Sequence, residues 1–387
     1  MSKILWYGDA CSNTGFARVT HSILEHLKKD HEVVVYGINY TGDPHGYPFK
    51  IYPAGAVNPS DKFGIGRIQQ IVERERPDFF ICLNDLWIVN QVWERIHLLK
   101  SQLNFKFIAY FPTDSEWYPL PMLRFIEDWD FAITFTPEQA QRLMAHGIKP
   151  KKLGIMPHGL DQGKFYAIDQ DEARKRLGLP LDKFIVFNGN RNQPRKLIDQ
   201  TIKAFAEFAK DKDDTILYLN MGEKDLGWAV QELFETEMRR RGADPAAKLA
   251  ITPNMNYMTA PPDEQLNLIY NAVDVGINTA NGEGWGLVPF EHALCKKPQI
   301  VPAHTSCQDI WKGKGLLIDV AAWISDKDLG VERGIVNYKH AAELIQLLYE
   351  DETYRKKVGE DCFEVTQNPA YRWDKIAEGF TKAMEII

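Results

Sequence analysis

Short apolar runs alternate with helix-spaced segments along most of the chain. In the first half, the runs that predict strands are Ile4–Tyr7, Glu32–Gly37, Phe79–Leu83, Phe107–Phe111, Phe131–Phe135 and Leu153–Met156. Between the first two, Phe16, Val19, Ile23 and Leu27 recur at the spacing of one helix face. This alternation predicts right-handed crossovers and a parallel sheet covered by helices on both faces, that is, a Rossmann-like domain.

A second series of the same kind follows Pro157–Asp161. Its predicted strands are Phe184–Asn188, Ile216–Asn220, Leu249–Thr252, Val273–Asn278, Gln299–Val301 and Leu316–Ile318. The polar run from Asp161 to Asp171 is predicted to be the linker. Because 387 residues exceed one core of ordinary size, two domains are expected. We therefore predict doubly wound α/β domains at residues 1–165 and 166–369.

Composition and charge narrow the class of protein. A net charge of −7 argues against a protein that binds nucleic acid or an anionic membrane through a broad basic face. No apolar run reaches the ~18 residues that a membrane span needs, and the run at the start is too short for a signal peptide. The five cysteines are scattered without a C-x-x-C pair, which indicates reduced thiols. We expect a cytoplasmic protein without membrane insertion.

The segment Asn281–Glu291 is the most informative stretch of the sequence. It follows the apolar run Val273–Ile277, contains three glycines within five residues, and leads into a helix-spaced run at Leu287–Leu294. A strand, a glycine-rich turn and a helix start form an anion site, because the first N–H groups of a helix have no intrahelical partner. Glu283 lies in the turn and Glu291 about two helical turns later, so both carboxylates can point to one side.

Glu283 and Glu291, with seven residues between them, resemble the E-x7-E signature of retaining glycosyltransferases with the two-domain GT-B architecture, most closely those of family four. The resemblance implies that Glu283 contacts donor-sugar hydroxyls and that Glu291 binds the ribose. It also implies that backbone amides hold the sugar and phosphate, here at Gly284, Trp285, Gly286 and Leu287. Alone, the motif equally fits a helix-capping Glu283 and a solvated Glu291.

The loop after the first strand of the second domain carries a basic cluster. Arg191 and Lys196 stand five apart, as do the family's Arg and Lys that hold the donor diphosphate, and Asn190 and Arg195 are further donor-binding candidates. A departing diphosphate gains negative charge, so neighbouring cations stabilise the transition state more than the ground state. The alternative is a solvated surface turn.

Two loops of the first domain carry further candidates. The loop Asp9–Arg18 lacks G-x-G-x-x-G and the P-loop pattern, but it resembles the family's first loop, in which Gly15 would let the diphosphate or the acceptor approach the backbone. Alternatively, Ser12, Asn13 or Thr14 simply caps the helix, and this reading is favoured for the loop in isolation.

The second of these loops is Tyr110–Pro119. Many family members carry a His-Asp pair there, whereas Pro112 and Thr113 precede Asp114 in this chain. Asp114 is therefore the candidate for orienting the acceptor hydroxyl, with turn capping as the alternative. The aromatic residues Trp117 and Tyr118 either stack on an acceptor sugar or belong to the core.

No metal site is predicted. The D-x-D pattern of metal-dependent glycosyltransferases occurs at Asp169, Asp211 and Asp326, but each match lies in a charged stretch where capping explains it better. The nucleotide base is expected near the loops after Ile216–Asn220 and Leu249–Thr252. The residues proposed to line it are Met221, Gly222, Pro253, Asn254 and Met255. No motif separates uracil from guanine, although we expect a UDP-sugar in preference to a GDP-sugar.

The resemblance covers nearly the full chain, in the family's order. It implies a retaining glycosyltransferase that moves a hexose from a nucleoside diphosphate sugar to an acceptor hydroxyl, without a metal or other cofactor. It also implies two Rossmann-like domains facing each other across a cleft, with the terminal helix at 370–387 packed on the first domain. A nucleotide-sugar epimerase, a phosphorylase-like enzyme and an inactive sugar-nucleotide-binding protein stay open as alternatives. The acceptor is not identified; nucleic acid is disfavoured, and a modified nucleotide stays open.

Overall fold

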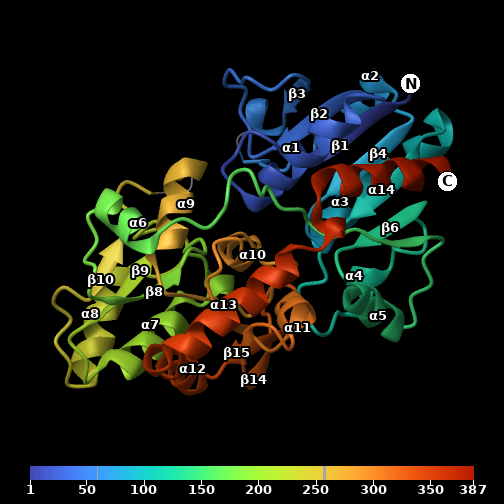
Figure 1. Ribbon diagram of the computed structural model, residues 1–387. Helices are drawn as coiled ribbons and strands as arrows, with labels where there is room; N and C mark the ends of the chain where they lie inside the picture. The colour runs from blue at the N-terminus through green and yellow to red at the C-terminus, as the bar shows by residue number, and fades with distance from the viewer. Residues whose placement is uncertain (59, 256–258) are drawn as a thin grey trace. The chain divides into compact units, whose positions relative to one another are not determined.

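The computed structural model describes residues 1–58, 60–255 and 259–387, which form two compact units (Figure 1). Unit 1 contains Met1–Thr113, Trp117–Gly159 and Pro369–Ile387, and unit 2 contains Asp114–Glu116 and Leu160–Asn368. The chain thus passes into unit 2 at residue 160, whereas the sequence placed the boundary at 165. A second difference is the three-residue segment Asp114–Glu116, which packs with unit 2 although its neighbours on both sides belong to unit 1.

Unit 1 is built on a seven-stranded parallel sheet. The strand order is β3-β2-β1-β4-β5-β6-β7. The strands are β1 (Lys3–Asp9), β2 (Glu32–Ile38), β3 (Lys50–Pro53), β4 (Phe79–Leu83), β5 (Lys106–Tyr110), β6 (Phe131–Thr134) and β7 (Leu153–Ile155). All but β3 coincide with predicted runs to within two residues at either end. Strand β3 lies at the sheet edge and ends in a proline, which cannot donate to a ladder.

The helices of unit 1 include the last helix of the chain. They are α1 (Gly15–Leu27), α2 (Ile68–Glu75), α3 (Leu86–Leu103), α4 (Leu120–Leu123), α5 (Pro137–Ala145) and α14 (Trp373–Glu385), with short 3-10 turns at η1 (Ala54–Ala56) and η3 (Pro369–Tyr371). Helix α14 packs against α1, and Phe380 lies 5.7 Å from Trp6 between ring centroids. A Cβ on Gly159 would come within 2.5 Å of Trp373, so the helix leaves no room for a side chain there.

Unit 2 contains a six-stranded parallel sheet and a separate antiparallel hairpin. The sheet order is β10-β9-β8-β11-β12-β13. The strands are β8 (Phe184–Asn188), β9 (Thr215–Leu219), β10 (Leu249–Ile251), β11 (Val275–Ile277), β12 (Gln299–Pro302) and β13 (Leu316–Ile318), and the hairpin pairs β14 (Val320–Ser325) with β15 (Glu332–Val336). The six strands of the sheet coincide with the predicted runs to within two residues. The hairpin was not predicted.

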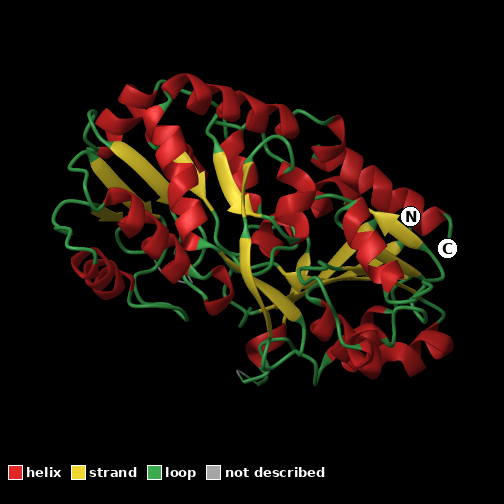
Figure 2. Cartoon of the chain, turned by 90° about the horizontal axis from the view of Figure 1, so that it is seen from below, coloured by secondary structure: helices red, strands yellow, loops and turns green. Residues whose placement is uncertain are grey.

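Helices cover the strands of each sheet, as Figure 2 shows. Those of unit 2 are α6 (Gln170–Leu177), α7 (Ile198–Ala209), α8 (Val230–Arg240), α9 (Asp263–Ala272), α10 (Leu287–Ala293), α11 (Thr305–Trp311), α12 (Tyr338–Glu350) and α13 (Glu352–Thr366), with a 3-10 turn at η2 (Pro194–Lys196). Helices α7 and α12 lie side by side (Figure 1). No helix in the described part of the chain is both long and apolar enough to span a membrane.

The order of each sheet shows where a ligand is expected. Strand order reverses between β1 and β4 in unit 1, and between β8 and β11 in unit 2. In open parallel sheets, ligands bind outside the carboxyl ends of the strands at such a reversal, because the two following loops diverge to opposite faces. The loops after β8 and β11 therefore mark the candidate site of unit 2. These loops contain the basic cluster and the glycine-rich turn.

Candidate active site

The pairing of β8 with β11 brings the basic loop beside the glycine-rich turn. Val275 of β11 is in register with Val186 of β8. Beyond the strands, backbone bonds continue the contact, since Asn281 N donates to Arg195 O at 2.9 Å. Thr279 adds a side-chain bond from Oγ1 to Leu197 O, also at 2.9 Å. Residues more than 80 positions apart in the sequence therefore share one site.

Glu283 is the centre of this site. Its Oε1 accepts hydrogen bonds from Lys196 Nζ and from Asn278 Nδ2, the latter at 3.1 Å. Its Oε2 accepts one from Arg195 Nη1 at 3.3 Å. Arg195 Nη1 also donates to Gly282 O. The carboxylate is buried and Lys196 is mostly buried, so this is an ion-pair cluster largely removed from solvent.

The surroundings of Glu283 favour its ionised form. Burial acts to raise the pKa of this carboxyl, but Lys196 and Arg195 outweigh burial and lower the pKa to about 2. Burial also lowers the pKa of Lys196, and the charge of Glu283 opposes that effect. The lowered pKa of Glu283 means that its carboxyl group is ionised at neutral pH.

Glu291 and the turn residues lie beside this cluster in the sequence but have different environments. Glu291, on α10, is buried, and its Oε2 accepts a hydrogen bond from Tyr270 Oη at 3.0 Å. Trp285 is also buried and packs edge-on against Phe290, so its ring belongs to the core. Gly284 has no side chain. Gly286, which has φ of +86°, directly precedes Leu287, the first residue of α10. Gly284 and Gly286 can thus contribute only backbone groups.

Arg191 has a different carboxylate partner from Lys196. Its Nε donates to Asp225 Oδ2 at 2.6 Å and its Nη2 to Asp225 Oδ1 at 3.2 Å, a bidentate pair. The structure therefore joins Lys196 and Arg195 on Glu283, whereas the sequence analysis grouped Lys196 with Arg191. Arg195, which the family pattern did not require, is the second cation on Glu283.

Asn190 lies in the loop directly after β8, and its side-chain amide is buried. Its backbone N donates to Asn188 Oδ1 at 2.9 Å, which fixes the loop immediately after β8. Its side-chain Nδ2 is buried and has no hydrogen-bond partner among the residues that the structure describes. A buried amide without a partner is costly, and such groups are frequent where a ligand completes the hydrogen bonding.

Strained backbone flanks the same cluster. Leu197, directly after Lys196, has φ of +44°, and Thr305, whose Oγ1 accepts from Glu283 N at 3.2 Å, has φ of +49°. A positive φ is unusual for Leu and is an outlier for a β-branched residue. Such residues persist only where the surrounding structure holds them, and they concentrate at functional sites.

Asp114 lies within unit 2 and pairs with Arg333 of β15. The ion pair joins Arg333 Nη1 to Asp114 Oδ2 at 2.9 Å. Arg333 was missed by the sequence analysis, because no motif includes it and the strand that bears it was not predicted. Of the aromatic residues in the same loop, Tyr118 is buried, whereas Trp117 is exposed and packs on His146 at 4.1 Å between centroids.

The remaining candidates are not joined to the cluster by the contacts described. Gly15 is the first residue of α1 in unit 1, and Thr14 is the N-cap, with its Oγ1 accepting from Ala17 N at 3.1 Å. Thr14 therefore caps this helix, and the role of Gly15 in donor or acceptor binding stays a prediction. Asn254 lies in a turn with φ of +57°, and Met255 follows it, half-buried, next to undescribed residues.

In two of the D-x-D matches, the first aspartate makes a local capping or turn hydrogen bond. Asp169 caps α6, since its Oδ1 accepts from Glu172 N at 2.9 Å. Asp326 accepts from Asp328 N at 3.0 Å within the hairpin turn. Across residues 1–58, 60–255 and 259–387, no group of three or more His, Cys, Asp or Glu side chains is arranged to hold a metal ion.

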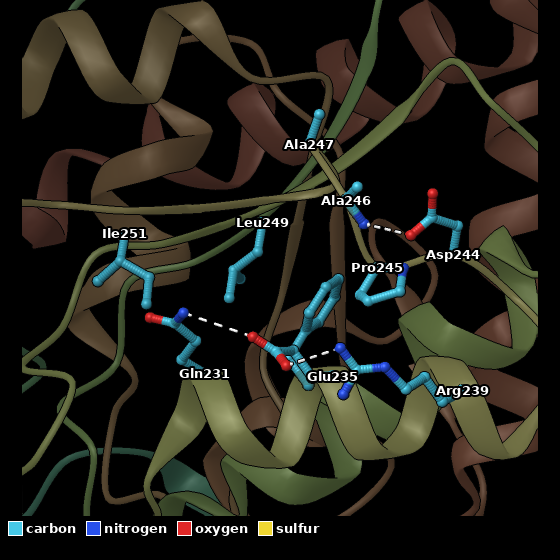
Figure 3. Close-up of a pocket in the computed structure, with 10 residues that line it drawn as sticks. Gln231, Glu235, Arg239, Asp244, Pro245, Ala246, Ala247, Leu249 and Ile251 are labelled. Atoms are coloured by element: carbon cyan, nitrogen blue, oxygen red, sulfur yellow. Dashed lines mark hydrogen bonds and ion pairs between the residues drawn. The ribbon is translucent and has the colours of Figure 1, made fainter.

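A pocket beside the edge strand β10 lies elsewhere in unit 2 (Figure 3). It is formed by α8, by β10 and by the loop from Asp244 to Ala247. An ion pair between Arg239 and Glu235, at 3.0 Å, lies along the helix on one wall. The described residues that line this pocket include none of the candidate site residues.

Two Rossmann-like parallel-sheet units, with an acidic and basic cluster at the strand-order reversal of the second, define the GT-B class of glycosyltransferase folds. The chain belongs to the family described as glycosyl transferases group 1, whose model matches residues 169–362.

Curated relatives and solved structures agree with this assignment. The chain is 29% identical over 175 residues to the D-inositol 3-phosphate glycosyltransferase of Acidothermus cellulolyticus, covering 44% of this chain and 38% of that protein. It is 25% identical over 256 residues to the protein of the same name from Thermomonospora curvata, covering 60% and 56%. The alignments therefore span little more than half, or less, of these relatives.

Structural similarity extends over the whole chain. Anabaena HepE, solved in complex with UDP and glucose, aligns with a TM-score of 0.73 at 15% identity and covers 100% of both chains. Sucrose-phosphate synthase from Thermosynechococcus elongatus aligns with a TM-score of 0.74 at 16% identity, covering 100% of this chain and 99% of that one. At such identity the likeness is one of fold.

Proposed function

We propose that the protein is a retaining glycosyltransferase that transfers a hexose from a UDP-sugar to an acceptor hydroxyl. The observation that carries this proposal is the buried cluster of Lys196, Arg195 and Glu283 at the strand-order reversal of unit 2. A diphosphate needs cations, and a sugar needs hydrogen-bond acceptors for its hydroxyls. This cluster provides both within one site.

In this proposal, the cations act on the leaving group. As the bond between the anomeric carbon and the diphosphate oxygen breaks, negative charge accumulates on the diphosphate, and Lys196 and Arg195 stabilise it. At 4 Å and an effective dielectric constant near 20, one such contact contributes about 4 kcal/mol before desolvation costs. The residues themselves support positioning and charge stabilisation, and the retaining outcome rests on the E-x7-E resemblance.

Glu283 has two roles in this scheme. Its carboxylate accepts hydrogen bonds from the donor-sugar hydroxyls, and it keeps the two cations in place when the donor is absent. Glu291 is assigned to the ribose hydroxyls, and Tyr270 orients its carboxylate through the bond at 3.0 Å. Asn190 is assigned to the donor, to which its buried Nδ2, without a partner among the described residues, could donate a hydrogen bond.

Metal independence follows from the same assignment. The side chains of Lys196 and Arg195 supply positive charge where other glycosyltransferases use a divalent cation, and the D-x-D matches at Asp169 and Asp326 are engaged in capping and turn contacts. The proposed enzyme therefore uses no metal or other cofactor. We place it in the cytoplasm on the basis of its five free cysteines, of which Cys11 alone is not buried.

Comparison with relatives suggests the substrates to test first. Anabaena HepE was solved in complex with UDP-glucose, so UDP-glucose is the first donor. The curated relatives are named for D-inositol 3-phosphate, so an inositol phosphate and other polyols are the first acceptors. Modified nucleotides belong in the same panel because the sequence leaves them open.

The test begins with binding. Thermal unfolding with UDP, GDP, ADP and their sugars should show the largest stabilisation with UDP ligands, about 2.7 kcal/mol at 100 times Kd. Turnover of UDP-glucose is then measured with each acceptor and with water alone. Conversion of the donor to another sugar nucleotide without an acceptor would indicate an epimerase, and tight UDP binding without any turnover would indicate a binding protein.

Lys196→Ala tests the diphosphate assignment. The variant should lose at least about tenfold in kcat/KM for UDP-glucose, because a cation that acts in the transition state is removed. Lys203→Ala is the matched control, since Lys203 pairs with Asp199 one helical turn away on the surface of α7. Activity of Lys196→Ala within twofold of the parent would contradict the assignment.

A further inference from the structure

The β14–β15 hairpin carries a buried arginine that no sequence motif assigns. Arg333 lies on β15, and its side chain is only 6% exposed. Most residues of β14 are exposed, whereas Arg333 on β15 is buried together with Gly334 and Val336 of the same strand. Placing a guanidinium out of water is costly unless its partners compensate, so a buried arginine requires a compensating partner.

Asp114 is that compensating partner. One nitrogen of Arg333, Nη1, donates to the backbone O of Asp114 at 2.8 Å and pairs with its Oδ2 at 2.9 Å. The two contacts fix both the backbone and the carboxylate of Asp114. Arg333 Nε, by contrast, is buried without a hydrogen-bond partner among the described residues. Arg333 thus contacts Asp114 in an orientation that leaves its own Nε without a hydrogen bond to a described residue.

The same arginine contacts the turn that carries Glu283. A Cβ on Gly282 would collide with both Asp114 O and Arg333 Nη1, so the three residues are in direct contact. Next to Arg333, Gly334 N donates to Asn281 O at 3.2 Å. The hairpin therefore holds Asp114 against the residue that immediately precedes Glu283.

A second set of contacts holds the other end of the Asp114–Glu116 segment. Glu116 Oε1 accepts from Thr305 N at 2.8 Å, and Thr305 Oγ1 accepts from Glu283 N at 3.2 Å. Glu116 N also donates to Glu332 O, next to Arg333, at 3.4 Å. Arg333 and Thr305 thus fasten the two ends of this short segment to the Gly282–Glu283 turn.

We propose that Arg333 is a positioning residue for the transfer reaction: it holds the Asp114 carboxylate beside the Glu283 turn so that Asp114 orients the acceptor hydroxyl. This inference rests on the proposed function. Arg333 itself does not touch the substrate. Its effect is through geometry, because a misplacement of about 1 Å in a group that orients a reactant can cost about a hundredfold in rate.

A purely structural arginine would behave differently. If Arg333 served only stability, its removal would lower the unfolding temperature and reduce the amount of folded protein. Turnover per folded molecule would then stay the same. A positioning role instead lowers kcat in the folded enzyme and does so only while Asp114 is present. The two roles are separated by a double-mutant cycle.

The cycle uses Arg333→Gln, Asp114→Asn and the double variant. The probe is UDP-glucose with water as acceptor, and UDP affinity is measured by calorimetry. Arg333→Gln should lower kcat about tenfold or more and leave the Kd for UDP within about twofold of the parent. In the Asp114→Asn background, the same substitution should change kcat by less than about twofold.

Two further variants keep the cycle informative if Arg333→Gln is poorly folded. Arg333→Lys retains the charge, but it places a single ammonium at the end of a differently shaped side chain in place of the planar guanidinium, so it should recover part of kcat. Arg241→Gln is the matched control, since Arg241 is also mostly buried and pairs with Glu237 at 2.6 Å in the same unit. It should lower the unfolding temperature without a change in kcat.

The outcomes separate this inference from the proposed function. A parent protein that neither binds UDP nor turns over UDP-glucose overturns the proposed function, and the inference with it. A parent that does both, with Arg333→Gln equally damaging in the presence and absence of Asp114, overturns the inference alone. An unchanged kcat in Arg333→Gln also overturns it.

Discussion

Replacing Glu283 by glutamine should have opposite effects on binding and on catalysis. The Glu283 carboxylate forms ion pairs with Lys196 and Arg195, which are the cations that the proposal assigns to the diphosphate. UDP must therefore compete with Glu283 for them. Glutamine keeps the size of the side chain, but it removes the charge and replaces one acceptor oxygen by an amide donor. The variant should bind UDP more tightly than the parent and turn over UDP-glucose more slowly.

The size of the effect follows from the electrostatics of the site. The pKa of Glu283 falls from its ordinary 4.5 to about 2. At about 1.4 kcal/mol per pH unit, the ionised carboxylate is favoured by about 3 kcal/mol. If the diphosphate displaces half of that interaction, Glu283→Gln gains about 1.5 kcal/mol, or roughly tenfold in Kd. Loss of the charged contact to the donor sugar should lower kcat about a hundredfold.

Calorimetry with UDP measures the first effect, and initial rates with UDP-glucose measure the second. Glu291→Gln is the matched control, because it removes the same charge from a carboxylate that contacts Tyr270 rather than the cations. It should weaken UDP binding through the ribose. Thermal unfolding adds a third measure, since ligand-free Glu283→Gln leaves Lys196 buried without its carboxylate and should regain stability when UDP binds. Weaker or unchanged UDP binding in Glu283→Gln would refute the competition argument.

Two predictions concern the stability of unit 1. Burial acts to raise the pKa of Glu75, but Lys3, Tyr52 and Lys50 outweigh it and lower the pKa to about 2. Glu75→Gln should therefore destabilise the protein by about 1–3 kcal/mol in urea unfolding at pH 7, with the difference fading as the pH falls from 4.5 towards 2. A difference that persists at pH 2 would contradict this assignment. The C-cap of α2, exposed Arg76, has φ of +44°, so Arg76→Gly should stabilise by about 0.5–1 kcal/mol without a change in turnover, whereas no gain is expected from Arg76→Ala.

The sequence predicted the two sheets because buried parallel strands leave a simple signal. β4 is apolar throughout and β8 is apolar up to its last residue, Asn188, so runs such as Phe79–Leu83 stand out against their surroundings. The hairpin leaves no such signal. Residues of β14 are mostly exposed and do not alternate, and β15 contains an arginine and a glycine. β14 is a strand because it pairs with β15, and its own residues carry no burial pattern that would predict it.

The sequence names candidate residues but does not show their contacts. Glu283 and Lys196 were named from the family resemblance and Arg195 as a further candidate, all in loops after predicted strands. Spacing alone does not show where a loop side chain points. The turn η2 brings both Arg195 and Lys196 to Glu283, whereas Arg191 is bound by Asp225, which is 34 residues away. The contact between Asp114 and Arg333 spans 219 residues and depends on a hairpin that the pattern did not reveal.

The ion pairs of Glu283 and the ion pair between Asp114 and Arg333 differ in the exposure of their cations, and this difference suits different roles. Arg195, whose side chain is 35% exposed, and Lys196 share one carboxylate, so an incoming diphosphate can take over contacts that Glu283 now makes. Arg333 is 6% exposed and contacts both the carboxylate and the backbone of Asp114, so exchange there would leave a buried guanidinium without a partner. Donor binding should therefore rearrange the contacts between Glu283 and its two cations and preserve the pair between Asp114 and Arg333. Under this arrangement Asp114 stays fixed relative to the Glu283 turn while the charges around the donor redistribute, which is what orientation of an acceptor hydroxyl requires.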